Sequence, residues 1–298
     1  MSKSIRSFIS HRLIVAVLPL CVATGCVADP IASSRPSAET WAFCGVHPDE
    51  PTALKRAKTL ATVAGIDASF GPCLPVDWAT YTTANPGDRY MDPAGYKRAL
   101  LNNAAAGMKT IVYDARIWST SASVRQAAIT FWQPHLANIR AWDMGDEFDP
   151  ASPDWGVLVA RWNLVLATVT PATGVGPFTN HLGNSGIMNQ ALVDMPAQAG
   201  HLSYDAYDIP LSLALAAEFA PKISHLMCAI NALDHSRFRP TNLGIESQML
   251  DHRDAGCDSF LIFGGDMPYG TDGFTTPSLV NSNGTPTWLA EAVYKGAL

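Results

Sequence analysis

From Thr40 onward, short apolar segments alternate with longer amphipathic segments, and eight of each kind follow one another along the chain. The short segments have the length of buried strands, and the longer ones have the spacing of helices that cover a sheet. Eight strand–helix units without a long linker predict a single α/β domain, a closed (β/α)8 TIM barrel. The expected strands are Trp41–Val46, Ile66–Phe70, Thr110–Asp114, Ala141–Gly145, Val175–Thr179, His201–Asp205, Leu226–Asn231 and Phe260–Phe263.

Helix-start signals follow most of these strands. An open, doubly wound sheet is the alternative fold, but it normally carries a glycine-rich turn after its first strand, and the segment WAFCGVHPDEP has none. The expected helices begin near Pro51, Asp92, Ser121, Pro153, Gly186, Leu211, Pro240 and Thr285.

Composition excludes two broad classes of protein. The chain has 298 residues, of which 48% are apolar and 15% charged, so it has enough apolar material for a packed core and is not a disordered tail. The formal net charge is −6, and Lys and Arg form no cluster beyond the extreme N-terminus. Nucleic acid is therefore not an expected partner, because phosphate binding needs a concentrated basic face.

The N-terminal segment has the pattern of an export signal. Lys3, Arg6 and Arg12 precede the apolar run 13–23, which is too short to span a bilayer. The following ATGC resembles a bacterial lipobox, in which Cys26 would be lipidated; plain secretion is the alternative. We therefore expect a signal peptide at 1–25, a flexible tether at 26–39 and the barrel at 40–298, in a secreted protein or an envelope lipoprotein that meets the membrane only through Cys26.

Four cysteines remain after the signal and the lipobox. Export permits oxidation, and cysteines on neighbouring strand–helix units are candidates for pairing. The expected disulfides are Cys44–Cys73 and Cys228–Cys257, with free buried thiols as the alternative.

Polar residues gather where the expected strands end, whereas positions at the strand starts are mostly apolar. In a TIM barrel the active site is built at the C-terminal ends of the strands. The two longest strand-to-helix loops, 71–91 and 264–284, rise from the same end. The candidate residues at these strand ends are Asp114, Asp146, Glu147, His181, Asp205, Tyr207, Asn231 and Asp266.

Strand alternation indicates which of these side chains face the barrel axis. The apolar positions Trp142, Met144, Leu202, Tyr204 and Ala206 are expected to face the outer helices. The opposite faces then carry Asp143, Gly145 and Glu147 on the fourth strand, and His201, Ser203, Asp205 and Tyr207 on the sixth. Glu147 and Asp205 are thereby expected to converge over the barrel mouth.

Two carboxylates that face each other across a pocket suit glycoside hydrolysis. One donates a proton to the leaving oxygen, and the other attacks the sugar or activates water. Aromatic side chains near the same rim suit sugar binding. These are Trp78, Tyr81, Tyr90, Trp118, Tyr207 and Tyr269.

The same residues also suit purely structural roles. A strand-end carboxylate also caps helices or pairs with arginine, and His181 and Asn231 also suit hydrogen bonding within loops. Trp142 is expected in the core, and Glu246 on a helix. No metal or other cofactor is expected, because the histidines and cysteines lack ligand spacing and no P-loop or GxSxG motif occurs.

The strings AWDMGDEFDP, HLSYDAYDIP and RFRPTNLGIESQML followed by DHRDAGCDSFLIFG resemble bacterial TIM-barrel glycoside hydrolases of the retaining clan. That family carries its acid/base Glu at the end of the fourth strand, inside Asn-Glu-Pro or Asp-Glu-Pro. The resemblance maps this role onto Glu147, with Asp146 before it and Phe148 in the usual place of Pro.

The chain departs from that pattern at the seventh strand. The family's nucleophile is a Glu at its end, whereas LMCAINALD offers Asn231. The second carboxylate is then Asp205 or, as second choice, Asp266, or else catalysis has been lost. SYDAYD is also similar to the Tyr-Asp motif of chitinase-type barrels, which use substrate assistance. The expected function is hydrolysis of a polysaccharide or cell-envelope glycan, with a non-catalytic glycan-binding barrel as the rival.

Overall fold

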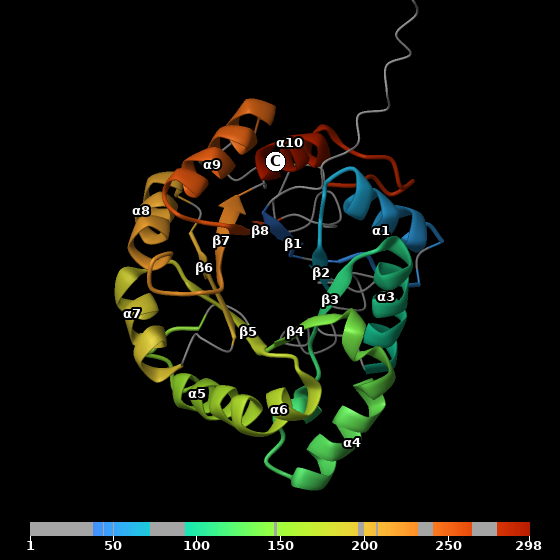
Figure 1. Ribbon diagram of the computed structural model, residues 1–298, viewed down its shortest axis with the longest axis vertical. Coiled ribbons are helices and arrows are strands. Elements are labelled where there is room, and N and C mark those ends of the chain that lie inside the picture. Colours follow the sequence, from blue (N-terminus) through green and yellow to red (C-terminus); the bar gives the residue numbers. More distant parts are fainter. Residues whose placement is uncertain are drawn as a thin grey trace, which may run out of the picture. The chain divides into compact units, whose positions relative to one another are not determined.

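Eight parallel strands close into one barrel, and each strand pairs with its two sequence neighbours, β1 with β8 included (Figure 1). The computed structural model describes residues 38–43, 45–49, 51–71, 93–145, 148–195, 200–206, 208–231, 241–263 and 279–298. The predicted (β/α)8 fold is confirmed. Residues 35–298 form a compact unit of their own.

The eight strands lie where the apolar segments predicted them. The sixth and seventh have the predicted bounds, whereas β1 begins at Glu39, inside the expected tether, because its ladder with β8 starts there. The strands are β1 Glu39–Ala42, β2 Ala68–Phe70, β3 Lys109–Val112, β4 Ile139–Asp143, β5 Pro177–Leu182, β6 His201–Asp205, β7 Leu226–Asn231 and β8 Ser259–Phe263.

Helices surround the barrel (Figure 1), and each of the eight expected helices is present within a few residues of its predicted start. The long helices are α1 Ala53–Thr62, α3 Pro93–Ala106, α4 Ala122–Trp132, α5 Trp155–Leu164, α7 Ser185–Asp194, α8 Ile209–Phe219, α9 Asn242–Asp254 and α10 Trp288–Ala297. Shorter elements are the 3-10 helices η1 Ala115–Trp118 and η2 Gln133–Asn138, the π-helical turn η3 Val165–Val169 and α6 Thr170–Thr173.

Aromatic side chains fill the centre of the barrel. The ring of Phe178 on β5 lies 5.5 Å from that of Trp41 on β1 and 5.2 Å from that of Phe70 on β2. All three residues are buried. These rings bridge strands on opposite sides of the barrel, so its interior is a packed core, as expected for eight strands.

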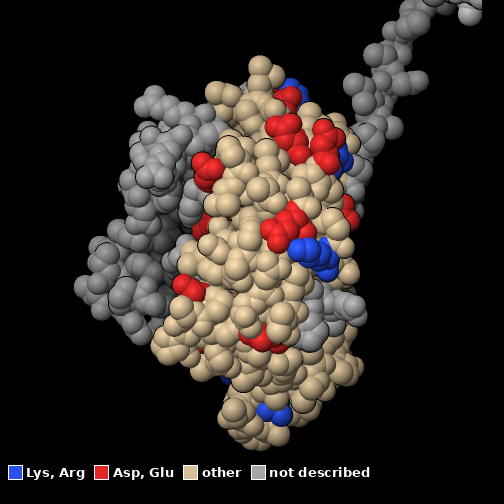
Figure 2. Space-filling view, turned by 90° about the vertical axis from the view of Figure 1, so that its left-hand side faces the viewer, with Lys and Arg blue, Asp and Glu red and all other residues tan. Residues whose placement is uncertain are grey.

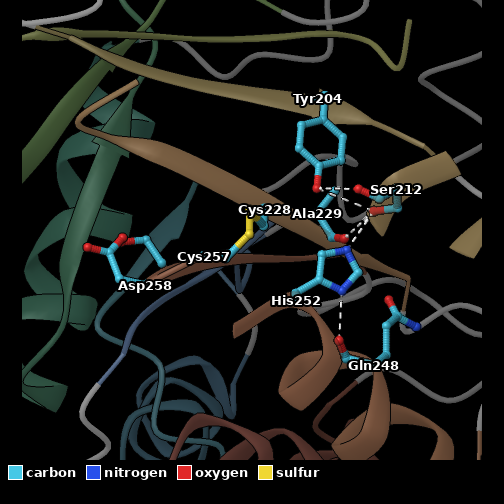
Figure 3. Close-up of a disulfide and its surroundings, with 9 residues drawn as sticks. Tyr204, Ser212, Cys228, Ala229, Gln248, His252, Cys257 and Asp258 are labelled. Carbon is cyan, nitrogen blue, oxygen red and sulfur yellow. Dashed lines mark hydrogen bonds between the residues drawn. A yellow bond between two sulfur atoms is a disulfide. The ribbon is translucent and has the colours of Figure 1, made fainter. Parts of the chain in front are cut away.

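The outward faces of β4 and β6 pack on the helices, as alternation predicted. Trp142 contacts Trp132 of α4. On β6, the Tyr204 hydroxyl donates to the Ser212 carbonyl of α8, and the Ser212 hydroxyl lies 2.8 Å from Nε2 of His252 on α9 (Figure 3). Because these polar groups are buried and satisfy one another, they fasten α8 and α9 to the barrel.

A disulfide joins Cys228 of β7 to Cys257, which precedes β8, with Cα atoms 6.2 Å apart (Figure 3). This pairing was predicted and is confirmed. It is reachable because Cys228 is the third residue of β7 and not its last, so both cysteines lie toward the strand starts. The predicted Cys44–Cys73 bridge falls outside the described residues.

The N-terminal end of the barrel carries charge, and the expectation of mostly apolar strand starts is wrong there. Arg140 of β4 donates to both carboxylate oxygens of Glu39 on β1, with Nη2 2.8 Å from Oε2, and its Nη1 lies 2.8 Å from Nε2 of His201. Trp41 Nε1 donates to the same carboxylate at 2.9 Å. We call Glu39, Trp41, Arg140 and His201 the N-terminal cluster. The attraction between Arg140 and Glu39 offsets part of the free-energy cost of removing these two charges from water.

Acidic side chains stand out on the side of the barrel shown in Figure 2, where only a few basic groups appear among the described residues. None of the helices in the described part of the chain is long and apolar enough to span a membrane.

Candidate active site

β4, β5 and β6 are neighbouring strands, and the C-terminal ends of β5 and β6 are level, whereas β4 ends opposite the start of β5. Asp143 of β4 pairs with Phe178 of β5, and Leu182 of β5 pairs with Asp205 of β6. β5 therefore lies between the two strands that precede the predicted catalytic carboxylates, and Asp205 lies level with the end of β5.

Asp205 is the last residue of β6 and is 7% exposed. Its backbone carbonyl accepts a hydrogen bond of 2.7 Å from Gly183, and a Cβ on Gly183 would lie 2.4 Å from that same oxygen. The glycine therefore lets β5 and β6 approach closely at this end. Alternation turns Asp205 away from the outward-facing Tyr204 and toward the barrel interior.

Several predicted site residues fall outside the described residues, and their roles stay predictions. Glu147 and Asp146 lie in sequence between Gly145 and Phe148, both of which are described. The others are Tyr207, Asp266 and the side chain of Asn231, together with the rim aromatics Trp78, Tyr81, Tyr90 and Tyr269.

Asp143 is a buried carboxylate on the inward face of β4, and it was not among the predicted site residues. It is 4% exposed, and its Oδ1 accepts a hydrogen bond of 3.0 Å from the Gly145 amide. Alternation had already placed Asp143 on the same face as Gly145 and position 147. The strand pattern therefore held the signal for Asp143, but motif reasoning favoured the carboxylates nearer the loop.

Tyr96 is a second unpredicted group near this end. It comes from the first turn of α3 and is 2% exposed. Its ring lies over Gly71, where a Cβ would sit 2.2 Å from the ring. Burial raises the pKa of Tyr96 well above its usual value, and the nearby Asp143 and Tyr113 add to this effect, so the hydroxyl keeps its proton. Hydrophobic periodicity does not indicate that a helix residue such as Tyr96 packs over a glycine that is distant in sequence.

His181 lies within β5 and not after it. It is fully buried, and its ring is 5.5 Å from that of Trp155 at the start of α5. Burial lowers the pKa of His181 to about 3, so the ring is neutral at ordinary pH. The structure gives this histidine a packing position beneath the segment that follows β4, and its predicted contact with substrate stays a prediction.

Asp114 follows β3 as predicted but is engaged by the protein itself. Its carboxylate accepts hydrogen bonds from the Arg116 side chain, at 2.7 Å to Nη2, and from Trp132 Nε1 at 2.8 Å. It also caps η1 through the Arg116 amide at 3.1 Å. These contacts match the alternative role of a strand-end carboxylate, which caps a helix and pairs with arginine.

Trp118 is 5% exposed, which leaves little ring surface for a sugar. Its ring makes an edge contact of 5.1 Å with Tyr113, and the Arg161 guanidinium lies 6.0 Å from it. Trp118, the last residue of η1, therefore packs against Arg161 of α5. Its predicted stacking on substrate stays a prediction.

Asn180 and Ser203 supply a polar layer beneath the mouth. The Ser203 hydroxyl donates to the Asn180 side-chain oxygen at 2.5 Å, and both residues are buried. The Ser203 hydroxyl and the Asn180 amide are both uncharged, so this layer adds no positive charge beneath the mouth.

Within the described residues, no group of three or more His, Cys, Asp or Glu side chains is arranged to hold a metal ion.

Comparison with known proteins shows similarity at the level of fold. No family model matches the sequence, and no curated protein matches it. Among solved structures, a family 39 glycoside hydrolase from the gut symbiont Bacteroides cellulosilyticus WH2 is 13% identical with a TM-score of 0.54, covering 88% of this chain. The catalytic core of xylanase A is 12% identical with a TM-score of 0.54, and the match covers 89% of this chain and 98% of that one.

A cold-adapted β-galactosidase from Rahnella sp. R3 is also similar, at 11% identity and a TM-score of 0.56 over 89% of this chain. The chain spans 64% of the Bacteroides enzyme and 56% of the Rahnella enzyme. At these identities the likeness concerns architecture, and function has to be argued from the site. This chain therefore shares the TIM-barrel fold of several glycoside hydrolases.

Proposed function

We propose that this protein is a glycoside hydrolase that cleaves the O-glycosidic bonds of a polysaccharide or cell-envelope glycan with two carboxylates. Glu147 is the general acid, and Asp205 is the nucleophile or the base that activates water. The observation that carries the proposal is the buried Asp205 at the C-terminal end of β6, in a barrel whose structural neighbours are glycoside hydrolases.

The separation of the two strands supports this pairing. β4 and β6 are divided only by β5, and two strand spacings amount to about 9.6 Å. Carboxyl groups that act together on a glycosidic bond lie about 5–5.5 Å apart in retaining enzymes and about 6.5–9.5 Å apart in inverting ones. Side chains that lean toward the barrel axis from β4 and β6 can span either range.

The test begins with a screen of polysaccharides to find a substrate, followed by Glu147→Gln. This change keeps the shape of the side chain and removes the donated proton, so turnover should fall by at least roughly a hundredfold. Substrate affinity should stay near wild type. A substrate with a very good leaving group should restore the first step, because it needs little protonation.

Three outcomes count against this proposal. If Glu147→Gln cleaves the identified substrate at the wild-type rate, Glu147 is not the acid. If no glycan is cleaved but several are bound, the protein is a glycan-binding barrel. Asn231 at the end of β7 favours this alternative, because the clan that the sequence resembles has its nucleophilic Glu at that position. If hydrolysis requires an N-acetyl group on the sugar, the substrate-assisted mechanism replaces Asp205 as nucleophile.

We propose in addition that the protein is exported, either secreted or anchored at the cell envelope through Cys26. The Cys228–Cys257 disulfide supports export, because disulfides persist in oxidising compartments. Cys26→Ser should release a membrane-bound protein into the soluble fraction. Mass spectrometry that finds an unmodified mature chain beginning after Cys26 would rule out the lipid anchor.

A further inference from the structure

The end of β6, where Asp205 lies, is paired with a neighbouring strand on one side only. Toward β5 the ladder continues to the last residue of the strand, where Asp205 pairs with Leu182. Toward β7, the last pair within the described residues is Ser203 with Met227, two residues before Asp205. On the β7 side, the strand end therefore depends on side-chain contacts and not on the ladder.

Ser212, in the first turn of α8, contacts both strands beyond the point where their ladder stops (Figure 3). Its backbone carbonyl accepts a hydrogen bond of 3.0 Å from the Tyr204 hydroxyl of β6, and its own hydroxyl lies 3.4 Å from the Ala229 carbonyl of β7. Tyr204 directly precedes Asp205 in the chain, and Ala229 is level with Asp205 in the register of the two strands. Ser212 therefore links β6 and β7 at the height of the proposed catalytic carboxylate.

The Ser212 hydroxyl is held in turn by α9. Nδ1 of His252 lies 2.7 Å from the Gln248 carbonyl, which can only accept a hydrogen bond, so Nδ1 carries the ring proton. Nε2 is then an acceptor, and the Ser212 hydroxyl donates to it at 2.8 Å. Burial lowers the pKa of His252, which keeps the ring neutral and in this tautomer. Because Tyr204, Ser212 and His252 are each at most 2% exposed, water does not compete for these bonds.

We propose that Tyr204 is a positioning residue for Asp205 and that Ser212 is the anchor to which it is tied. This inference rests on the proposed function, in which Asp205 is the nucleophile or the base. Successive side chains of a strand point to opposite faces, so a bond that fixes the outward Tyr204 also orients the backbone from which the inward Asp205 projects. From the β5 side, the Gly183 amide holds the Asp205 carbonyl at 2.7 Å. The backbone of Asp205 is thus held from two directions.

The test is Tyr204→Phe in the full chain, assayed on the polysaccharide found in the screen. Phenylalanine fills the same space, so the change removes the hydrogen bond to Ser212 without opening a cavity. Displacement of a catalytic group by about 1 Å can cost roughly a hundredfold in rate, so a partial loosening of Asp205 should lower kcat by roughly tenfold. KM should change little, because the lost interaction acts in the transition state and the binding surface is intact.

A double-mutant cycle with Asp205→Asn separates positioning from a general loss of structure. If Tyr204 acts through Asp205, adding Tyr204→Phe to Asp205→Asn should lower the residual kcat by less than about twofold, because the carboxylate that it positions is already gone. A further tenfold loss in the Asp205→Asn background would overturn the positioning role, since the two effects would then be independent.

The matched control is Thr110→Val, which removes a buried hydroxyl that ties a strand to an outer helix elsewhere in the barrel. Thr110 of β3 accepts a hydrogen bond of 2.9 Å from the Asn103 side chain of α3, and both residues are buried. The melting temperature should fall by a few degrees in Thr110→Val and in Tyr204→Phe, because each loses one buried hydrogen bond. Only Tyr204→Phe should lose kcat, and an equal loss in both variants would overturn the proposal.

Failure of the positioning role and failure of the proposed function give different results. If Asp205→Asn loses activity but Tyr204→Phe keeps the wild-type kcat, only the positioning role is overturned. If Asp205→Asn cleaves at the wild-type rate, Asp205 takes no part in the reaction. The two-carboxylate mechanism with Asp205 then fails, and the positioning role fails with it.

Discussion

The two ends of the barrel treat buried charge in opposite ways. At the N-terminal end, the Glu39 carboxylate is met by Arg140 and Trp41, and Arg140 also contacts His201. At the C-terminal end, the described residues gather two buried carboxylates, Asp143 and Asp205, from strands on either side of β5. At the first end a carboxylate and a guanidinium meet directly, whereas at the second the two buried carboxylates come from strands on either side of β5.

This difference separates stability from chemistry. Burial alone would raise the pKa of Glu39, but hydrogen bonds from Arg140 and Trp41 outweigh it and the pKa is lowered, so the ionised form stabilises the fold. Buried carboxylates near the C-terminal ends of barrel strands are typical of sites that perform reactions. Changes in the N-terminal cluster should therefore alter stability and leave kcat unchanged, and changes to the carboxylates at the mouth should lower activity and change stability little.

The largest expected effect is that of Asp205→Asn. If Asp205 is the nucleophile or base, kcat should fall by a factor between roughly 10² and 10⁴, and a good leaving group should not restore it. The melting temperature should change little. Asp258→Asn, at an exposed aspartate before β8, is the matched control and should leave both values unchanged. Full activity of Asp205→Asn would remove this residue from the mechanism.

The next effect concerns the disulfide, which lies toward the strand starts. Cys228→Ala releases a loop of 29 residues and should lower the free energy of unfolding by about 3.5 kcal/mol, while kcat stays unchanged. In the double variant Cys228→Ala with Cys257→Ala, the free energy of unfolding should fall only slightly further, by a small packing cost, because the single variant has already lost the disulfide. Denaturation by urea measures this. Peptide mapping that finds both thiols free in the wild-type protein would contradict the expectation.

A smaller loss is expected for Arg140→Met. It leaves the Glu39 carboxylate without its cation at a site where the two side chains are 31% and 25% exposed. Breaking a fully buried pair costs about 3–5 kcal/mol, so a half-buried one should cost about 2 kcal/mol of unfolding free energy. The matched control is Arg98→Met, whose pair with Asp49 is half exposed and should contribute much less. Equal losses in the two variants would show that the N-terminal cluster adds nothing beyond a surface pair.

The barrel could be predicted from the sequence because its signal is local. Apolar runs and helix-start residues repeat eight times, and strand alternation is enough to turn Trp142 and Tyr204 outward. The same alternation placed Asp205 on the inward face. These inferences need only the residues next to one another in the chain, and the structure confirms the outward positions of Trp142 and Tyr204.

The contacts that escaped prediction join residues far apart in sequence. Glu39 and Arg140 are 101 residues apart, and nothing in either strand indicates its partner. Arg140 also sits where the β3–β4 register shifts, so simple alternation fails at that strand start. Tyr96 reaches the mouth from a helix because Gly71 has no side chain. Such close approaches follow from packing in three dimensions, which a pattern in one dimension does not contain.

The last expected effect is the pH dependence of stability, to which one buried histidine at each end of the barrel contributes. Burial lowers the pKa of His201 to about 3, with Arg140 and His225 adding to this effect, and burial lowers the pKa of His181 at the mouth to about 3 as well. The unfolded chain binds protons on these rings below pH 6.5, whereas the folded chain stays neutral. Stability should therefore be full above pH 6.5 and fall as the pH drops from 6.5 toward 3.

Each buried histidine should contribute a slope of about 1.4 kcal/mol per pH unit in this window. Glu39 contributes loss in the same direction, but only below its ordinary value of 4.5, so urea denaturation at pH 6.5, 5.5 and 5.0 isolates the histidines. His201→Gln and His181→Gln should each reduce the slope by the share of one proton. Of the two, only His181→Gln should also change kcat, because His181 pairs with Phe148, which directly follows the proposed acid in sequence, while His201 belongs to the N-terminal cluster. An unchanged slope in both variants would mean that neither histidine is neutral in the folded protein at acid pH.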